Sequence, residues 1–217
     1  MKISNRLIFF GLCGLILFLL FMHHRFPSDD GNILHRELYR FFDLDGEGNF
    51  PTWISGSLLL ASALLSLLGG WFSRELDLGK PFSQGCFLMF LLFTFLSFDE
   101  ISGFHESLTY VVGVKWVYLY FPFFVVVSVL LWFSWSKSGS PEKSFFLSTY
   151  FGLLIFAAGG LLLEWIYYRF GPPLEFINRF KFRIEEGLEL FGAVVIFTSM
   201  LRCIETLYSS WKKRYIS

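Results

Sequence analysis

Six long apolar segments alternate with shorter polar segments along the chain. A membrane-spanning helix needs about 20 mostly apolar residues, because each residue adds about 1.5 Å and the hydrocarbon core is about 30 Å thick. Six segments meet this requirement and cover approximately residues 7–26, 53–72, 82–104, 116–135, 145–168 and 185–208. The pattern predicts an all-α, polytopic membrane bundle of six transmembrane helices, forming a single integral membrane domain over residues 1–217.

The first connection, residues 23–52, is longer than the others and has a pattern of its own. Leu34, Leu38, Phe41 and Phe42 are spaced so that they share one face of a helix. This pattern predicts a short amphipathic helix lying in the membrane interface of the first outer loop. A helix that packs on the outside of the bundle without touching lipid is the alternative.

The composition agrees with a membrane protein. Hydrophobic residues make up 54% of the chain and charged residues 17%, which is too apolar for an ordinary soluble domain. Phe alone occurs 30 times, and aromatic side chains at this density suit lipid-facing surfaces and interfacial belts. The expected partner is therefore the lipid bilayer, and the formal net charge of zero gives no indication of a nucleic-acid partner.

An even number of spans places both termini on the same side of the membrane. Ten of the 18 Lys and Arg residues fall on that side, including the cluster at residues 212–214 beside the last span. Positive residues favour the cytoplasmic side, so both termini are expected in the cytoplasm. The first span follows Lys2 and Arg6 as in a signal peptide, but no small-residue cleavage site follows Met22, and we expect an uncleaved anchor.

The acidic residues are distributed far more unevenly than the basic ones. Fourteen of 18 fall on the side opposite the termini, although acidic residues contribute little to membrane topology. Asp99 and Glu100 lie near the end of the third span. Carboxylates inside a membrane are costly and usually mark a functional site.

The order of the spans brings further polar residues to the same membrane depth. The third and fifth spans end on the outer side, and the sixth span begins there. On a continuous helix, Asp99 and Glu106 are seven residues apart and share a face. In the sixth span, Glu185 and Glu186 lie four and three residues before Glu189, so these three carboxylates also share a face. Residues 157–160, Ala-Ala-Gly-Gly, predict a close approach of another helix to the fifth span.

A group of carboxylates needs a cation, bound protons or basic partners to coexist in a low-dielectric site. All-oxygen ligands suit Ca²⁺, Mg²⁺ or Mn²⁺, and carboxylates with one His also suit Zn²⁺, Mn²⁺ or iron. We therefore expect a divalent metal ion, with ligands from the outer ends of the third and sixth spans. The expected ligands are Asp99, Glu100, His105, Glu106, Glu185 and Glu189, with Glu164, Glu186, Asp43, Asp45 and Glu47 as additional candidates. In the alternative, the carboxylates are structural and pair with Arg179, Lys181 and Arg183.

Residues 43–48, Asp-Leu-Asp-Gly-Glu-Gly, match the first half of a calcium-binding loop. The match fails further on, because Ile54 stands where the loop needs a bidentate Glu and Pro51 intrudes. A polar turn leading into the second span is the simpler interpretation, with Pro51 near its first helical position. In a second interpretation, residues 43–48 fold over the acidic cluster and contribute a carboxylate ligand to it.

Three motifs carry a resemblance to known proteins. They are FDLDGEGNFPTW (Phe42–Trp53), FLSFDEISGFHE (Phe95–Glu106) and RIEEGLELFG (Arg183–Gly192). Together they resemble a group of uncharacterised bacterial polytopic membrane proteins. The resemblance implies a location in the bacterial inner membrane and carries no activity.

The sequence favours a cation-binding membrane protein that serves metal-dependent chemistry or ion movement. No nucleophile elbow, phosphate-binding loop or dinucleotide fingerprint is present, so no catalytic residue is assigned. One alternative is a non-catalytic subunit or assembly factor that packs against a membrane-protein partner or a second copy of the chain. Another is a proton-coupled carrier, although the inverted repeats typical of carriers are not evident.

Overall fold

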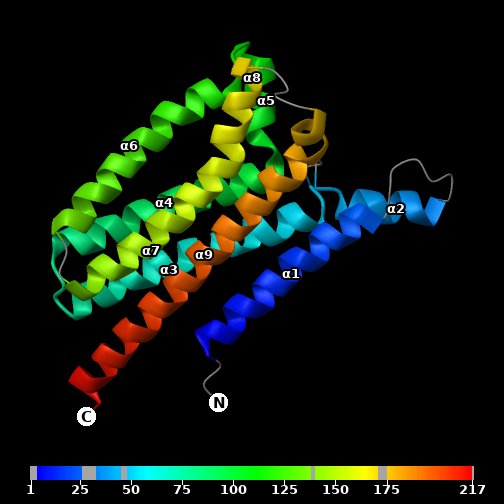
Figure 1. The fold of residues 1–217 in the computed structure, drawn as a ribbon. Helices are drawn as coiled ribbons and strands as arrows, with labels where there is room; N and C mark the ends of the chain where they lie inside the picture. The colour runs from blue at the N-terminus through cyan, green and yellow to red at the C-terminus, as the bar shows by residue number, and fades with distance from the viewer. Residues whose placement is uncertain (1–3, 26–32, 45–47, 138–139, 171–174, 217) are drawn as a thin grey trace.

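The computed structural model describes residues 4–25, 33–44, 48–137, 140–170 and 175–216, with side chains except at 140–143 and 175–182. The described residues are almost entirely helical, and none of them lies in a strand (Figure 1). The elements are α1 (Asn5–Arg25), α2 (Ile33–Phe42), α3 (Phe50–Glu75), α4 (Lys80–Ser102), α5 (Phe104–Val112), α6 (Trp116–Lys137), α7 (Ser140–Ala157), the π-helix η1 (Ala158–Leu163), α8 (Glu164–Phe170) and α9 (Glu175–Tyr215).

Six helical segments are long and apolar enough to cross a membrane, which confirms the predicted bundle of six membrane helices. They are α1, α3, α4, α6, the continuous run from Ser144 in α7 through η1 to Phe170, and α9 from Arg183 onward. The observed ends lie within a few residues of the prediction except at α9. That helix has 41 residues and extends beyond both predicted ends, 185 and 208.

The centre of the bundle is formed by α3, α4, α7 and α9, with α1 packed on α9 and α6 packed on α4 and α7 (Figure 1). The core between them is closely packed, and Leu59, Phe93 and Ile196 are fully enclosed. A second apolar cluster joins α1 to α9 through Leu19 and Leu190. Because α3 packs on both α4 and α9, burial of these side chains fixes the positions of these two helices and of the residues at their outer ends.

Within the first connection, the described residues form the predicted helix, α2, and the start of α3. In α2, Phe42 is buried and contacts the second apolar cluster, whereas Leu34 and Phe41 are exposed. Asn49 caps α3 through a reciprocal capping box with Thr52, and Pro51 lies in the first turn, as predicted.

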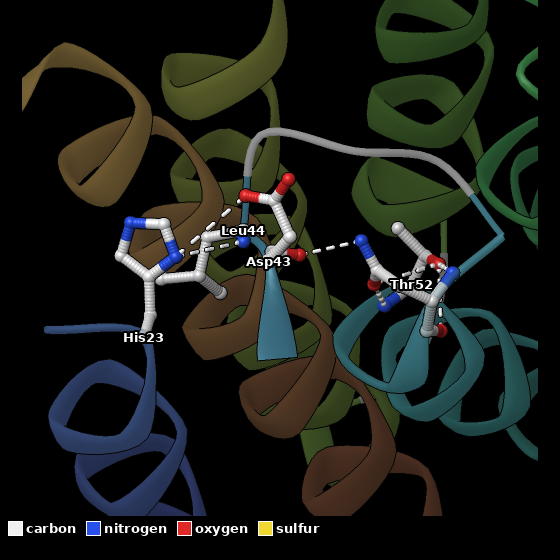
Figure 2. A network of polar contacts seen from close by, with 5 residues as sticks. His23, Asp43, Leu44 and Thr52 are labelled. Carbon is white, nitrogen blue, oxygen red and sulfur yellow. Dashed lines mark hydrogen bonds and ion pairs between the residues drawn. The ribbon is translucent and has the colours of Figure 1, made fainter. Parts of the chain in front are cut away.

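Asp43 and Leu44, at the start of the calcium-like loop, contact His23 of α1 and Asn49 at the start of α3 through polar groups (Figure 2). The side chain of Asn49 donates from Nδ2 to the carbonyl oxygen of Asp43. The backbone N–H of Leu44 donates to Nδ1 of His23 at 3.1 Å, and the carboxylate of Asp43 lies 3.7 Å from the same nitrogen. Asp45 and Glu47 lie outside the described residues.

The third span ends close to its predicted end at residue 104, but the helix is not continuous as far as Glu106. It ends at Ser102, because Gly103 adopts a left-handed conformation (φ 59°) that glycine tolerates without strain. A separate helix, α5, begins at Phe104. Asp99 and Glu106 therefore do not share the face of one helix.

Candidate functional site

A cavity of about 80 Å³ lies at the end of the bundle opposite the two termini, between α4, α6, the α7–η1 segment and α9. One part of its wall is polar and the rest is apolar. The ionisable residues that line it are Asp99, Glu100, His105, Tyr120, Glu185, Glu186 and Glu189. Among the described side chains, no Lys or Arg lines this cavity.

The end of α4 at Gly103 allows His105, in the first turn of α5, to contact the carboxylate of Asp99. The backbone N–H of His105 donates to Oδ1 of Asp99 at 2.9 Å, and its ring Nδ1 lies 3.2 Å from Oδ2, to which it donates when Asp99 is ionised. From α6, the hydroxyl of Tyr120 donates to Oδ1 of Asp99 at 2.9 Å. Asp99 thus accepts three hydrogen bonds, and it fixes the position of both neighbours.

Aromatic rings complete this side of the cavity. The ring of Trp116 lies 4.6 Å from the ring of His105 and 5.3 Å from that of Tyr120, centroid to centroid. In the tautomer in which Nδ1 of His105 donates to an ionised Asp99, Nε2 is the basic nitrogen of the neutral ring. An imidazole oriented by a carboxylate is the arrangement that proteins use to orient histidines that bind metals or accept protons.

Three carboxylates meet on the other side of the cavity. Glu100, Glu186 and Glu189 each offer an oxygen, and these three oxygens lie within 4.8 Å of one another. Two oxygens on opposite sides of one Ca²⁺ ion would be separated by about 5 Å, twice the usual bond length. The spacing of the three carboxylates therefore suits a single hard cation.

Glu100 is held in place from α3. Its side chain is 8% exposed, and the hydroxyl of Ser55 lies 2.5 Å from its Oε1, as a hydrogen-bond donor. The same hydroxyl lies 3.1 Å from the carbonyl oxygen of Thr52, one turn earlier. A serine hydroxyl has one proton and two lone pairs, so Ser55 can donate to an ionised Glu100 or accept from a protonated one.

Two glycines of the π-helix leave room for Glu185 and Glu189 of α9. A β-carbon at Gly160 would overlap the carboxylate of Glu189, and one at Gly159 would lie 2.7 Å from the carbonyl oxygen of Glu185. The predicted close approach at residues 157–160 is thus observed. Wide turns of this kind occur frequently at functional sites.

The predicted site residues separate into two groups in the structure. Those that line the cavity are Asp99, Glu100, His105, Glu185, Glu186 and Glu189. Glu106 is exposed on α5 and does not line the cavity, Glu164 accepts a hydrogen bond from Tyr168, and Asp43 belongs to the His23 network. Of the three basic residues of the structural alternative, Arg179 and Lys181 lie outside the described side chains, and Arg183 is described but does not line the cavity.

The sequence prediction did not include Ser55, Tyr120 or Gly160 as site residues. A signal for Ser55 was present, because the serines of α3 recur at helical spacing and Ser55, Ser62 and Ser66 are all buried. Tyr120 follows Trp116 by one turn at the start of a span, which reads equally well as an interfacial belt. Periodicity alone does not separate the two interpretations.

Six membrane-length helices, four of which line an acidic cavity, give this molecule the architecture of a polytopic helical membrane protein. The chain belongs to the family described as Domain of unknown function (DUF8692), whose model matches residues 7–203. The matched region runs from α1 into α9 and contains all the cavity residues named above. No curated protein and no solved structure matches the chain.

Proposed function

We propose that the cavity binds a divalent cation through Glu100, Glu186 and Glu189, and that the Asp99–His105 pair acts beside it. The observation that carries this proposal is the meeting of three carboxylate oxygens within 4.8 Å in a cavity that no described Lys or Arg side chain lines. Carboxylates so close together repel one another strongly at low dielectric, and a cation among them offsets that repulsion. Oxygen ligands favour Mg²⁺, Ca²⁺ or Mn²⁺.

Metal-dependent chemistry is favoured over ion movement. A cation lowers the pKa of a bound water, and a carboxylate-oriented histidine is suited to accept the proton released. Ion movement is favoured by charged groups along a path, yet the buried polar side chains that continue along α3, Ser62, Ser66 and Ser73, are uncharged. The sequence of α9 carries no acidic residue between Glu189 and Glu205. The cluster lies at one end of the bundle, where it can meet a substrate from the membrane surface.

Elemental analysis of the detergent-purified protein tests the cation. We expect about one divalent metal per chain in the wild type, and loss of that metal in the double variant Glu100→Gln/Glu189→Gln. Glu106→Gln is the matched control, because Glu106 is acidic, lies close in sequence and does not line the cavity. A wild type without metal after dialysis against micromolar Mn²⁺, Mg²⁺ and Ca²⁺ would contradict the proposal and favour structural carboxylates.

We further propose that the protein lies in a bacterial inner membrane with both termini in the cytoplasm. The basic cluster at residues 212–214 and the resemblance of the three motifs support this orientation and location. Ser210→Cys and Ser107→Cys, each exposed, would report the two sides in a chain whose native cysteines are replaced. A membrane-impermeant maleimide added to cells with a permeabilised outer membrane should label residue 107 and leave residue 210 unlabelled. The reverse pattern would contradict the orientation.

A further inference from the structure

Another cavity lies at the end of the bundle that carries the two termini, where the start of α1 lies beside the C-terminal half of α9 (Figure 1). Its volume is about 430 Å³. Phe10 and the two arginines that line it are exposed, so this cavity is open on the side of the bundle. We call it the α1–α9 cleft. Its described lining residues are Asn5, Arg6, Phe9 and Phe10 of α1, and Thr198, Ser199 and Arg202 of α9.

The cleft holds basic and hydroxyl groups that have no acceptor within the described part of the chain. The guanidinium groups of Arg6 and Arg202 make no ion pair or hydrogen bond with a described residue, and the same is true of the hydroxyl of Ser199. Glu205, three residues after Arg202, instead accepts a hydrogen bond from Nδ2 of Asn5 at 2.7 Å. Two positive charges and one hydroxyl donor, from two different helices, thus line one cleft.

Both arginines lie near one boundary of the hydrocarbon core. On α9, Arg202 follows Glu186 by sixteen residues, which is about 24 Å of helix. On α1, Arg6 precedes His23 by seventeen residues, which is about 26 Å of helix. Glu186 and His23 lie at the other end of the bundle, and the hydrocarbon core is about 30 Å thick. Long basic side chains at the depth of Arg6 and Arg202 extend to the lipid phosphates of the nearer leaflet.

We propose that the α1–α9 cleft binds the phosphate group of one anionic membrane phospholipid through the guanidinium groups of Arg6 and Arg202 and the hydroxyl of Ser199. Arginine pairs strongly with phosphate through charge-assisted hydrogen bonds. Basic pockets between membrane helices are a known mode of binding anionic headgroups. The inference goes beyond the proposed function and does not depend on it, because the cleft and the acidic cavity lie at opposite ends of the bundle.

The surroundings of the cleft favour a lipid over a free anion. Phe9 and Phe10 line the cleft, and Phe10 is 68% exposed. Leu17, two turns further along α1, is equally exposed, so an apolar surface continues from the cleft toward the middle of the bilayer. The acyl chains of a lipid held at its phosphate lie against this surface without leaving the hydrocarbon core. A free phosphate would have to leave water to reach the same place, which is costly for a charged group.

Native mass spectrometry of the full chain in mild detergent tests the inference on the wild type. Phosphatidylglycerol is the anionic probe, phosphatidylcholine the zwitterionic probe and inorganic phosphate the free anion. We expect one phosphatidylglycerol per chain, bound at least fivefold more tightly than phosphatidylcholine and retained in millimolar inorganic phosphate. Equal affinity for the two lipids would overturn the inference. Displacement of the lipid by inorganic phosphate would also overturn it and would assign the cleft to a free anion.

Variants of the two arginines locate the lipid. Arg6→Gln and Arg202→Gln each remove one charge from the cleft. Each should weaken the binding of phosphatidylglycerol about fivefold, the factor that one basic residue contributes near an anionic membrane surface. Arg74→Gln is the matched control, because Arg74 is also exposed at the end of the bundle that carries the termini but does not line the cleft. Losses of the same size in all three variants would show general attraction of lipid to basic residues and would overturn the site.

Thr198→Trp tests the shape of the cleft and keeps both arginines. It places a larger side chain into the cleft and should lower the affinity for phosphatidylglycerol at least fivefold. Leu7→Trp is its control, because Leu7 is 70% exposed and does not line the cleft. Equal binding in these two variants would overturn the inference. The comparison of lipids uses the wild type alone, so the inference stays testable even if a variant fails to fold.

Discussion

Gly160 of η1 lies directly against the carboxylate of Glu189 of α9, so that a β-carbon at position 160 would overlap Oε1 of Glu189. Gly160→Ala should displace this carboxylate and weaken Mn²⁺ binding by about tenfold or more. The backbone itself favours alanine over glycine in a helix by about 0.5–1 kcal/mol, so the stability of the fold should change little. Titration of Mn²⁺ followed by electron paramagnetic resonance measures the effect.

The control for this substitution is Gly14→Ala, at a helical glycine with nothing within 4 Å of the added carbon. It should bind Mn²⁺ as the wild type does. Equal affinity in Gly160→Ala and Gly14→Ala would show that the position of Glu189 does not matter for the cation.

Asp99→Asn tests the carboxylate that holds His105 and Tyr120. An amide can accept only at its oxygen, so at least one of the three hydrogen bonds to Asp99 is lost or weakened. Hydrogen bonds to charged groups contribute about 1.5–3 kcal/mol each, and the free energy of unfolding should fall by about that amount. Unfolding in mixed micelles with increasing dodecyl sulfate measures it, and Glu106→Gln should change it by less than about 0.5 kcal/mol.

Ser55→Ala removes the hydroxyl that contacts Glu100. A buried carboxylate that loses a donor costs about 1–3 kcal/mol, so the variant without metal should unfold more easily by that amount. Ser55→Thr keeps the hydroxyl and should recover most of the loss. In Ser66→Ala the hydroxyl lost is also buried but donates to a backbone carbonyl of its own helix, and the cost should be smaller. A larger cost for Ser66→Ala than for Ser55→Ala would contradict the assigned role of Ser55.

Asn49→Ala removes the cap of α3 and its hydrogen bond to the carbonyl oxygen of Asp43 (Figure 2). Loss of an N-cap costs about 0.5–2 kcal/mol, measured again by unfolding in mixed micelles. Thr52→Ala removes the other half of the same capping box. The double variant should therefore cost less than the sum of the two single variants, because residues in one network are not additive. Strict additivity would argue against the shared box.

The sequence predicted the spans well because apolar length and helix rise suffice to find them. The sequence also predicted that the end of the third span and the start of the sixth lie at the same membrane depth, because consecutive spans cross the membrane in opposite directions. The break at Gly103 was missed because glycine is common inside membrane helices. The contact that accompanies the break, Asp99 accepting the backbone N–H of His105, joins residues six apart and leaves no periodic signal.

The partners of the site from other helices could not be predicted for a similar reason. Ser55 contacts Glu100, and Tyr120 contacts Asp99, only because α3 and α6 pack on α4. The length and hydropathy of the spans do not predict which helices are neighbours in a bundle. The extension of α9 back to Glu175 was missed as well. Residues 175–184 carry charges and fall below the hydropathy of a span, although their propensities allow a helix.

The length of α9 has a mechanical consequence. Its 41 residues form a rod of about 62 Å, twice the thickness of the hydrocarbon core. The rod is fastened at its far end, where Arg214 and Tyr215 both donate to the carbonyl oxygen of Glu75 and Trp211 packs on Phe72. At its other end α9 is held by η1, where Gly159 and Gly160 lie against Glu185 and Glu189. Because the helix is held at both ends, it keeps these carboxylates at a constant distance from the end that carries Trp211.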